Sequence, residues 1–208
     1  RIVISHPHLD HVGGLVAIVE HLAIGEVELA VAVGEEPRLP ALIRLLAVAK
    51  ERGIPVRAPH EEALGATVLT PLHPVDAAGA IAVDEVRTTN DNSVVLRVAW
   101  QGASILFPGD LEAEGEAELG DRHAELRTTL LKIPHHGSST SSSERLLDAA
   151  QPQLAILSGG RHNRFGLPKP SVMERYRQHG IPIRRTDLEG AIRVELDSDG
   201  AIQVRRVR

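Results

Sequence analysis

The amino-acid sequence predicts a mixed α/β fold in which two sheets pack together and helices lie on the outside. Helix–strand units and β-hairpins recur in both halves of the chain, which is typical of such layered folds. The segments KERGIPVRA (Lys50–Ala58) and RQHGIPIRR (Arg177–Arg185) each indicate a helix end, a glycine stop and a strand. No linker, charge block or low-complexity tract divides the chain, so we expect a single domain over residues 1–208.

The first half is expected to open directly on a strand, Arg1–Ile4. Apolar residues then recur at helical spacing from Leu15 to Leu22, and Gly25 ends this helix. Because the chain begins within a strand and has no initiator methionine, we expect it to be a fragment of a longer protein. The other elements predicted in this half are strands at Val27–Val33, Ile54–Arg57 and Thr67–Leu72 and a helix at Pro40–Arg52.

The second half is expected to begin with a β-hairpin whose strands, Ser93–Trp100 and Ala103–Phe107, are joined by a tight turn. A further hairpin is expected at the end of the chain, at Ala191–Leu196 and Ala201–Val207. Between them we predict helices at Leu111–Leu119, Ser143–Ala150 and Ser171–His179 and strands at Leu130–Ile133, Leu154–Leu157 and Ile181–Arg185.

The composition excludes several kinds of site. The chain has no cysteine, which rules out thiolate metal ligands, disulfides and cysteine nucleophiles. It contains neither a Gly-x-Ser-x-Gly elbow nor a Walker-type phosphate loop, which disfavours a serine hydrolase and a P-loop nucleotidase. The net charge of −5 argues against a globally basic nucleic-acid binder, although residues 161–169 carry a local cluster of basic side chains.

The strongest chemical signal is SHPHLDHVGG, which runs from Ser5 to Gly14. Alternate residues of an extended turn point to the same side, so His6 and His8 can bind one ion. Asp10 and His11 follow immediately and can bind a second ion beside it. Imidazole and carboxylate ligands suit Zn²⁺, Mn²⁺ or Fe²⁺.

Two later segments are expected to complete this metal site. In FPGDLE, Asp110 leaves the end of a strand and can bridge two ions with its two oxygens; alone, it would read as the N-cap of the following helix. In IPHHGSS, His136 is the preferred last ligand of the second ion, with His135 supporting the site or contacting substrate. The reverse assignment of His135 and His136 stays open.

These motifs resemble those of the metallo-β-lactamase superfamily, with its His-x-His-x-Asp-His dinuclear site. The resemblance implies a four-layer αββα sandwich, here without its first strand or strands. It also implies two divalent ions, Zn or Mn, as cofactors. The ligands that match the family pattern are His6, His8, Asp10, His11, Asp110 and His136.

A more specific resemblance covers nearly the whole chain. SHPHLDHVGGL, NDNSVVLRV, FPGDLEAEGEAEL, LKIPHHGSSTSSSERLLDAAQPQLAILSGG and RTDLEGAI are similar, in this order, to the C-terminal domain of ComEC-type DNA-uptake competence proteins. This implies an extracytoplasmic (periplasmic or cell-surface) domain of a bacterial inner-membrane protein. The implied partners are DNA and the membrane channel of the same protein, with no separate protein partner.

The activity implied by this resemblance is that of a metal-dependent nuclease that degrades the DNA strand that is not imported. In the expected phosphodiester hydrolysis, Asp110 holds the ions, Asp10 orients the attacking water and His135 is the third catalytic residue. Phosphate contacts are expected from a set of polar and basic side chains after the second histidine motif, namely Ser138, Arg161, Asn163 and Lys169. The serine-rich run Ser138–Ser143 reads equally well as a loop that caps a helix.

The chain departs from the family pattern at two places that bear on catalysis. No third histidine for the first ion precedes the Ser93–Trp100 strand, and Asp91 or a water is the expected substitute. Leu167 and Lys169 stand where competence-type domains commonly have histidines, and Leu167 cannot protonate a leaving group. Asn92 and Ser93 match a family element whose role stays open, and Asp187 is a candidate supporting residue.

Two rival functions stay open, and the departures favour the second of them. The first is another hydrolase of the same fold that acts on a lactone, a thioester or a small phosphodiester. The second is a DNA-guiding module that keeps the fold but lacks an efficient catalytic centre. Metal content measured together with DNA affinity separates the module from the nuclease.

Overall fold

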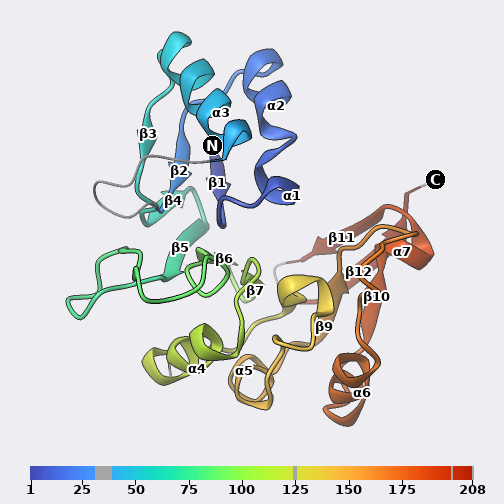
Figure 1. The fold of residues 1–208 in the computed structure, drawn as a ribbon. Coiled ribbons are helices and arrows are strands. Elements are labelled where there is room, and N and C mark those ends of the chain that lie inside the picture. The colour runs from blue at the N-terminus through green and yellow to red at the C-terminus, as the bar shows by residue number, and fades with distance from the viewer. Residues whose placement is uncertain (31–38, 124–125, 198, 208) are drawn as a thin grey trace.

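The computed structural model describes residues 1–30, 39–123, 126–197 and 199–207. Figure 1 shows the strands lying between two groups of helices, with α2 and α3 on the outer side of a small sheet and α4, α5 and α6 beyond a large one. The predicted α/β class, with sheets inside and helices outside, is confirmed. In the part of the chain that the structure describes, no helix combines the length and the apolar character needed to cross a bilayer.

The small sheet contains three parallel strands in the order β1-β2-β3. Parallel strands need crossover connections, and the helices that follow β1 and β2 along the chain provide them. These helices bury Val12, Val19 and Leu45 against Ile4 and Leu29 of the sheet. The bounds are β1 (Ile2–Ile4), α1 (Leu9–Val12), α2 (Leu15–His21), β2 (Val27–Leu29), α3 (Pro40–Glu51) and β3 (Val56–Arg57).

The large sheet has seven strands in the order β10-β9-β8-β7-β6-β5-β4, antiparallel from β4 to β7 and parallel from β7 to β10. Its core joins Leu106 and Leu131 of the sheet to Leu119, Leu147 and Tyr176 of the helices. The bounds are β4 (Glu62–Leu64), β5 (Thr67–His73), β6 (Val95–Trp100), β7 (Ala103–Phe107), α4 (Ala113–Arg122), β8 (Leu130–Lys132), α5 (Glu144–Ala150), β9 (Leu154–Leu157), α6 (Pro170–Gln178) and β10 (Ile183–Arg185).

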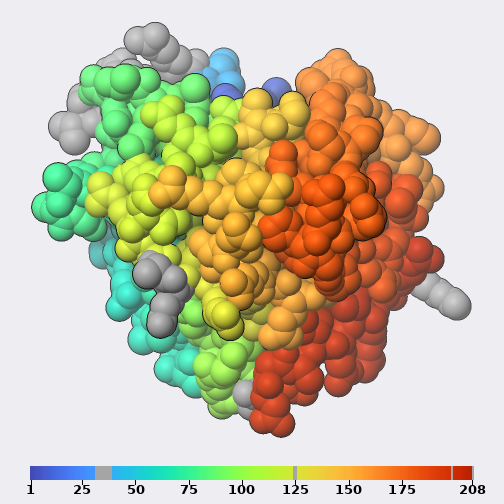
Figure 2. Space-filling view, turned by 90° about the horizontal axis from the view of Figure 1, so that it is seen from below, coloured from blue at the N-terminus to red at the C-terminus, as the bar shows by residue number. Residues whose placement is uncertain are grey.

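Figure 2 views this helical side from below. The yellow-green to orange segments that carry α4, α5 and α6 cover the face, and blue N-terminal residues reach the surface only at its upper margin. The end of the chain adds a short helix, α7 (Thr186–Glu189), and a separate antiparallel pair, β11 (Ile192–Leu196) and β12 (Ile202–Arg206). The final hairpin was predicted, but as a two-stranded sheet of its own it adds a third sheet to the two expected.

The repeated helix–glycine–strand unit is found in both halves with the same backbone chemistry. Gly53 and Gly180 both have positive φ, +66° and +65°, which a glycine adopts without steric cost. In each unit the residue after the glycine bonds back across the helix end, from Ile54 N to Ala49 O at 2.8 Å and from Ile181 N to Tyr176 O at 3.0 Å. Both strands therefore begin two residues later than predicted, because these isoleucines still belong to the helix termination.

Several elements differ from those predicted. The strand β4 and the one-turn helices α1 and α7 were not predicted, since each spans only three or four residues. The helix expected from Leu111 begins at Ala113, because Leu111 is buried in the core and Asp91 Oδ1 accepts the free N–H groups of Glu112 and Gly115. The strand expected at Val27–Val33 is described as far as Leu29, and residues 31–33 lie outside the described residues.

Candidate metal centre

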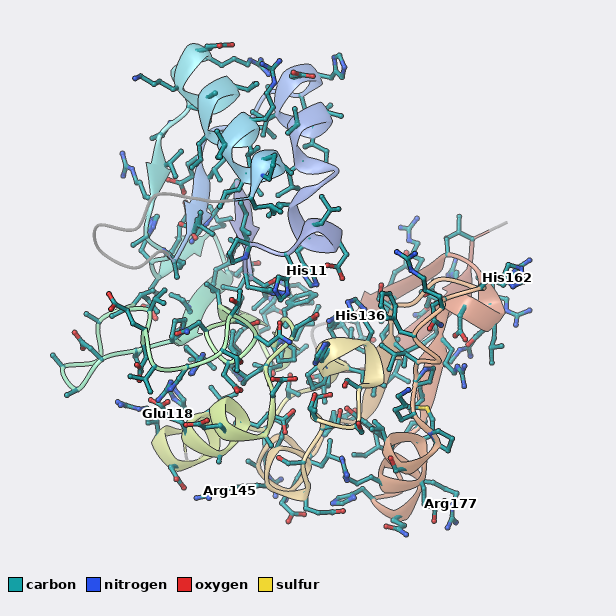
Figure 3. All side chains as sticks on the ribbon, viewed as in Figure 1. His11, Glu118, His136, Arg145, His162 and Arg177 are labelled. Carbon is teal, nitrogen blue, oxygen red and sulfur yellow. The ribbon has the colours of Figure 1, made fainter. Side chains whose placement is uncertain are left out.

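Three strand ends meet at the candidate site. β1 ends before His6, β7 ends before Asp110, and β8 ends before His135 and His136. Gly109 allows this approach, because a Cβ at this position would lie 2.8 Å from Ser5 Cβ and 2.9 Å from Ser93 Cβ. Figure 3 shows the result, with His11 and His136 pointing toward each other across the centre of the molecule.

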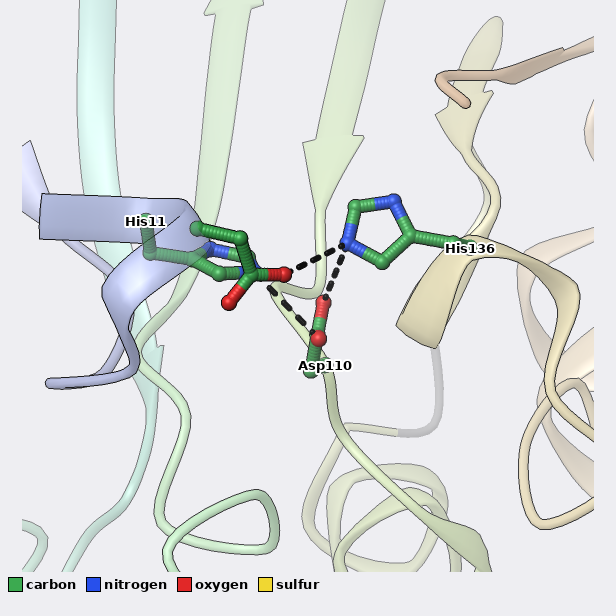
Figure 4. Close-up of side chains that lie close together, drawn as sticks. His11, Asp110 and His136 are labelled. Carbon is green, nitrogen blue, oxygen red and sulfur yellow. Dashed lines mark ion pairs between the residues drawn. The ribbon is translucent and has the colours of Figure 1, made fainter. Parts of the chain in front are cut away.

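Four side chains form a compact group of metal-ligating type. One ligand atom from each of Asp10, His11, Asp110 and His136 lies within 4.8 Å of the others. Asp110 Oδ2 is 3.3 Å from His11 Nε2, and Asp110 Oδ1 is 3.6 Å from His136 Nε2 (Figure 4). Asp10 Oδ2 lies 3.6 Å from each of the two Nε2 atoms. Ligands held at about 2.1 Å from a tetrahedral ion stand about 3.4 Å apart, so the separations suit a divalent ion.

The chemistry of the two imidazoles supports this fit. The Nε2 atoms of His11 and His136 are both buried and have no hydrogen-bond partner in the structure. Their Nδ1 atoms are anchored instead, at 3.0 Å from Ser5 Oγ and 2.8 Å from the Ser158 carbonyl oxygen. Anchoring of one ring nitrogen fixes the ring and leaves the other for a metal. A divalent ion would satisfy both orphaned Nε2 atoms.

Asp110 is the ionised centre of this group. The side chain is 4% exposed, and burial acts to raise the pKa of its carboxyl. The contact with the His11 ring and the nearby Lys132 and His136 outweigh burial and hold that pKa well below its usual range. Asp110 is therefore an anion, as a metal ligand must be.

His6 and His8 lie beside the four-residue group, but fewer ligand atoms surround them. His6 Nε2 is 3.0 Å from His8 Nδ1 and 3.9 Å from Asp110 Oδ2. Burial first, and then the nearby His11, lower the pKa of His6 to about 3, so the His6 ring is neutral at neutral pH. Ser5 Oγ and Ser93 Oγ stand 3.2 and 3.3 Å from His6 Nδ1 and orient it.

The NDNS segment supports the fold around the site and supplies no third ligand. The expected substitution of a ligand by Asp91 is not found, because its Oδ1 accepts the N–H groups of Glu112 and Gly115 and its Oδ2 accepts from Thr88 Oγ1. The Asn92 amide is committed to backbone atoms of Asp84 and Thr88. Ser93 alone touches the site, through His6 and through the N–H of Asp110.

The two histidines of PHHGS face different partners. His135 and His136 have φ values of +45° and +51°, which are uncommon for non-glycine residues. This left-handed backbone turns His136 toward Asp10 and Asp110, whereas His135 Nδ1 lies 3.2 Å from Glu112 Oε1. His135 Nε2 is 4.0 Å from Asp110 Oδ2. The geometry favours His136 as the ligand, the assignment preferred from the sequence.

Lys132 is a site residue that the sequence reasoning missed. Its Nζ donates to the Gly109 carbonyl oxygen at 2.9 Å and lies 3.5 Å from Asp110 Oδ1. Burial lowers the pKa of the Lys132 amine, and the charge of Asp110 opposes that shift. The available signal was a lysine at the end of the otherwise apolar strand Leu130–Lys132.

The residues expected to contact phosphate lie in two places. Ser138 follows the histidine turn, and the other three lie in the loop over residues 161–169. The Asn163 side chain is occupied by the Leu167 backbone, and Lys169 Nζ donates to the Phe165 carbonyl oxygen. Arg161 is exposed, whereas the neighbouring His162 lies far from the centre (Figure 3). Asp187 is paired with Arg185 and makes no contact with the four-residue group.

Of the two readings of the serine-rich run, the structure shows the helix cap. Ser138 Oγ is 3.1 Å from Thr140 Oγ1 beside the histidine turn. At the other end, Ser143 is the N-cap of α5 and accepts the N–H of Leu146. Thr140 Oγ1 also donates to Glu112 Oε1 at 2.6 Å, which links this run to the partner of His135.

Comparison with known proteins places the chain in a family. The family model described as "Metallo-beta-lactamase superfamily" matches residues 1–161. Competence protein ComA of Neisseria gonorrhoeae is 42% identical over 120 residues, which is 57% of this chain and 17% of that protein. ComE operon protein 3 of Bacillus subtilis is 28% identical over 191 residues, or 92% of this chain and 24% of that protein. The chain thus spans a quarter or less of the length of these relatives.

Solved structures agree on the fold. CmlA, described as a diiron β-hydroxylase from Streptomyces venezuelae, superposes with a TM-score of 0.53 at 11% identity, over 99% of this chain and 44% of CmlA. An identity this low speaks for the fold alone. The extent of the family match, together with the His-x-His-x-Asp-His turn and the ligand group around Asp110, leads to one conclusion. The chain belongs to the metallo-β-lactamase superfamily.

Proposed function

We propose that this chain is a metal-dependent phosphodiesterase, acting as the nuclease domain of a ComEC-like DNA-uptake protein. The observation that supports it most strongly is the group formed by Asp10, His11, Asp110 and His136, whose two imidazole Nε2 atoms are buried without a partner. The similarity to a competence protein and to a ComE operon protein supports the choice of DNA as substrate.

The four residues of this group are the proposed ligands of a divalent ion, Zn²⁺ or Mn²⁺. Such an ion supplies a Lewis acid for a phosphoryl oxygen and lowers the pKa of water. Asp10 has an open side, with 64% of its side chain exposed, so its carboxylate can orient the attacking water and accept a proton from it.

His135 is the proposed proton donor to the leaving oxygen. Its Nδ1 is held beside Glu112, 3.2 Å from Oε1, and its Nε2 faces Asp110 from 4.0 Å without acting as a ligand of the four-residue group. A carboxylate at Nδ1 fixes the orientation of the ring and leaves Nε2 directed at the centre. His135 thereby takes over the role that Leu167, in place of a family histidine, cannot perform.

The loop over residues 160–169 favours a nucleic acid over a small ester as substrate. Phe165 is 67% exposed, and the Arg164 guanidinium lies 5.6 Å from the centre of its ring. An exposed aromatic ring is a platform on which bases stack, and arginine attracts the phosphate backbone. Lys169 N donates to the Gly137 carbonyl oxygen at 2.9 Å, so this loop is attached to the turn that carries His136.

The wider setting follows from the same relatives. We propose an extracytoplasmic position, periplasmic or at the cell surface, next to the membrane channel of the same protein. In that setting DNA is the partner, and the activity removes the strand that is not imported. Arg161, Lys169 and the hydroxyl of Ser138 are the proposed phosphate contacts, whereas Asn163 shapes the loop by bonding the backbone of Leu167.

The test is a cleavage assay on the purified chain with Mn²⁺ or Zn²⁺ and with both single-stranded and duplex DNA. We expect cleavage by the wild-type chain, none by His136→Ala, and none in excess EDTA. His21→Ala is the matched control, because this exposed histidine lies in the last turn of α2, outside every proposed contact, and its loss should leave the rate unchanged. Equal rates for wild type and His136→Ala would refute the proposal.

A DNA-guiding module is the second candidate, and one observation favours it. Within the part of the chain that the structure describes, the His6–His8 pair is joined by no third ligand in a compact group, whereas the exposed Phe165 and Arg164 serve binding regardless of catalysis. For this candidate, Phe165→Ala should weaken DNA binding while the wild-type chain cuts nothing with any metal. Cleavage lost in His136→Ala, with DNA affinity retained, would rule the module out.

A further inference from the structure

We propose that the centre holds a single divalent ion, bound by Asp10, His11, Asp110 and His136, and that the Lys132 ammonium group is the second positive charge at Asp110. The inference rests on the proposed metal centre, but not on which ester that centre cleaves. It replaces the two ions expected from the sequence with one ion and one lysine.

The first step concerns the ligands of the other ion. His6 and His8 supply two nitrogens 3.0 Å apart, and His8 is exposed to solvent. Catalytic zinc sites use three protein ligands and structural sites use four. Among the described residues, no third histidine or carboxylate joins this pair in a group as compact as the one around His136. The pair alone is therefore a weak site.

The second step concerns the bridging carboxylate that a second ion would need. Asp110 Oδ2 is approached by His11 at 3.3 Å, while Oδ1 is shared between His136 at 3.6 Å and Lys132 at 3.5 Å. One lone-pair direction of Asp110 is thus taken by an ammonium group. Bridging two ions would crowd two divalent cations and the Lys132 ammonium group around one carboxylate.

The third step concerns how firmly Lys132 is held. Its Nζ donates to the Gly109 carbonyl oxygen at 2.9 Å, and only 18% of its side chain is exposed. Gly109 itself is packed against Ser5 and Ser93, the two serines that orient His6. The lysine is therefore built into the centre by the same strand ends that deliver Asp110. A second divalent ion at His6 and His8 would face a cation that these contacts hold beside Asp110.

The test counts bound metal in the full chain, by calorimetric titration with Mn²⁺ and by elemental analysis after gel filtration. We expect one equivalent in wild type, one in His8→Ala and none in His136→Ala. Two equivalents in wild type, reduced to one by His8→Ala, would overturn the proposal. Lys132→Arg, which keeps the charge, should also bind one.

Removal of the lysine charge gives the second measurement. The Lys132→Met variant should bind a second equivalent of Mn²⁺, because Asp110 becomes free to bridge. The double variant Lys132→Met with His8→Ala should bind one equivalent again. A single equivalent in Lys132→Met, in a protein whose circular dichroism matches wild type, would refute the role given to Lys132. These counts need no nuclease assay, so a chain that binds one ion and cuts no DNA would refute the proposed function and leave this inference standing.

Discussion

The two histidine turns deliver their ligands to the same centre by different physical means. The turn after β1 carries His6, His8, Asp10 and His11 on ordinary backbone, an extended stretch that runs into the first turn of α1. The turn after β8 carries His136 on a left-handed backbone that continues through Gly137 at φ +79°. In the first turn residue spacing sets where the side chains point, whereas in the second the surrounding structure does.

The second turn is held by a polar network that extends from its serine-rich run to α4 and α6. Ser141 Oγ donates to the Pro134 carbonyl oxygen at 3.0 Å, and the Ser142 and Ser143 N–H groups each donate to Glu116 at 2.6 Å. Arg175 Nη1 donates to the Ser141 carbonyl oxygen at 3.0 Å. A left-handed histidine pair is strained, and such strain persists where neighbouring contacts over-determine the conformation.

The largest effect, on metal affinity, is expected when the histidines of the second turn are replaced one at a time. His136→Ala should lower metal affinity by more than about 100-fold, since even partners behind a ligand contribute about 10–100-fold. His135→Ala should retain metal binding within about tenfold, because its ring faces Glu112. Calorimetric titration of both variants measures this. The opposite order would assign His135 as the ligand.

Removal of Glu116 should destabilise the second turn. Glu116→Ala leaves the Ser142 and Ser143 N–H groups buried without an acceptor, at a cost of about 2–4 kcal/mol in the free energy of unfolding. Urea denaturation of the metal-free chain measures the loss. Glu114→Ala is the matched control, since Glu114 is exposed on the same helix and its loss should change little. Similar stability for both variants would show that the Glu116 network does not stabilise the second turn.

The two turns should also differ in their tolerance of an added methyl group. Gly137→Ala places a Cβ 2.6 Å from Pro168 Cβ at positive φ, and should cost about 1–3 kcal/mol in unfolding free energy. Gly14→Ala, after the first turn, meets nothing within 4 Å at φ −85° and should cost less than about 1 kcal/mol. Thermal or urea unfolding compares the pair. Equal costs would mean that the second turn is no more constrained than the first.

The smallest effect is expected from a hydroxyl behind the first turn. Ser5→Ala removes the partner of His6 Nδ1 and His11 Nδ1, and should weaken metal binding by about tenfold with little loss of stability. Ser139→Ala, on an exposed residue of the second turn's loop, is the control and should leave the affinity unchanged. An unchanged affinity in Ser5→Ala would show that spacing alone orients the first turn.

The first turn could be predicted from the sequence better than the second, because residue spacing sets the first and distant packing sets the second. His11 and Asp10 are placed by short-range spacing, and Asp110 by its position at a strand end, so the sequence predicts all three. The choice between His135 and His136 stayed open because left-handed backbone at both positions depends on packing far away in the sequence. Most elements of the fold were predicted from periodicity, whereas the order of seven strands in the large sheet is a long-range property that periodicity does not encode.

Single residues without a surrounding pattern were missed or misassigned. Lys132 was overlooked because one lysine at the end of an apolar strand reads as a solvated strand terminus. Glu112, the partner of His135, reads as an ordinary helix-start residue. The sequence position of Asp91 suits a ligand, but in the structure Asp91 accepts N–H groups from the first turn of α4. Only the three-dimensional arrangement of α4 separates these two roles.

The two hydrophobic cores described above have a consequence for how the molecule assembles. One core holds the turn with His11, and the other holds Asp110 and His136, which are joined to the first by about 100 residues of chain. An ion bound by all four ligands acts as a non-covalent cross-link that closes this long loop. Because the ion binds only when the two cores are correctly docked, its affinity depends on how much of the chain is docked. A substitution inside either core, far from any ligand, would therefore weaken metal binding.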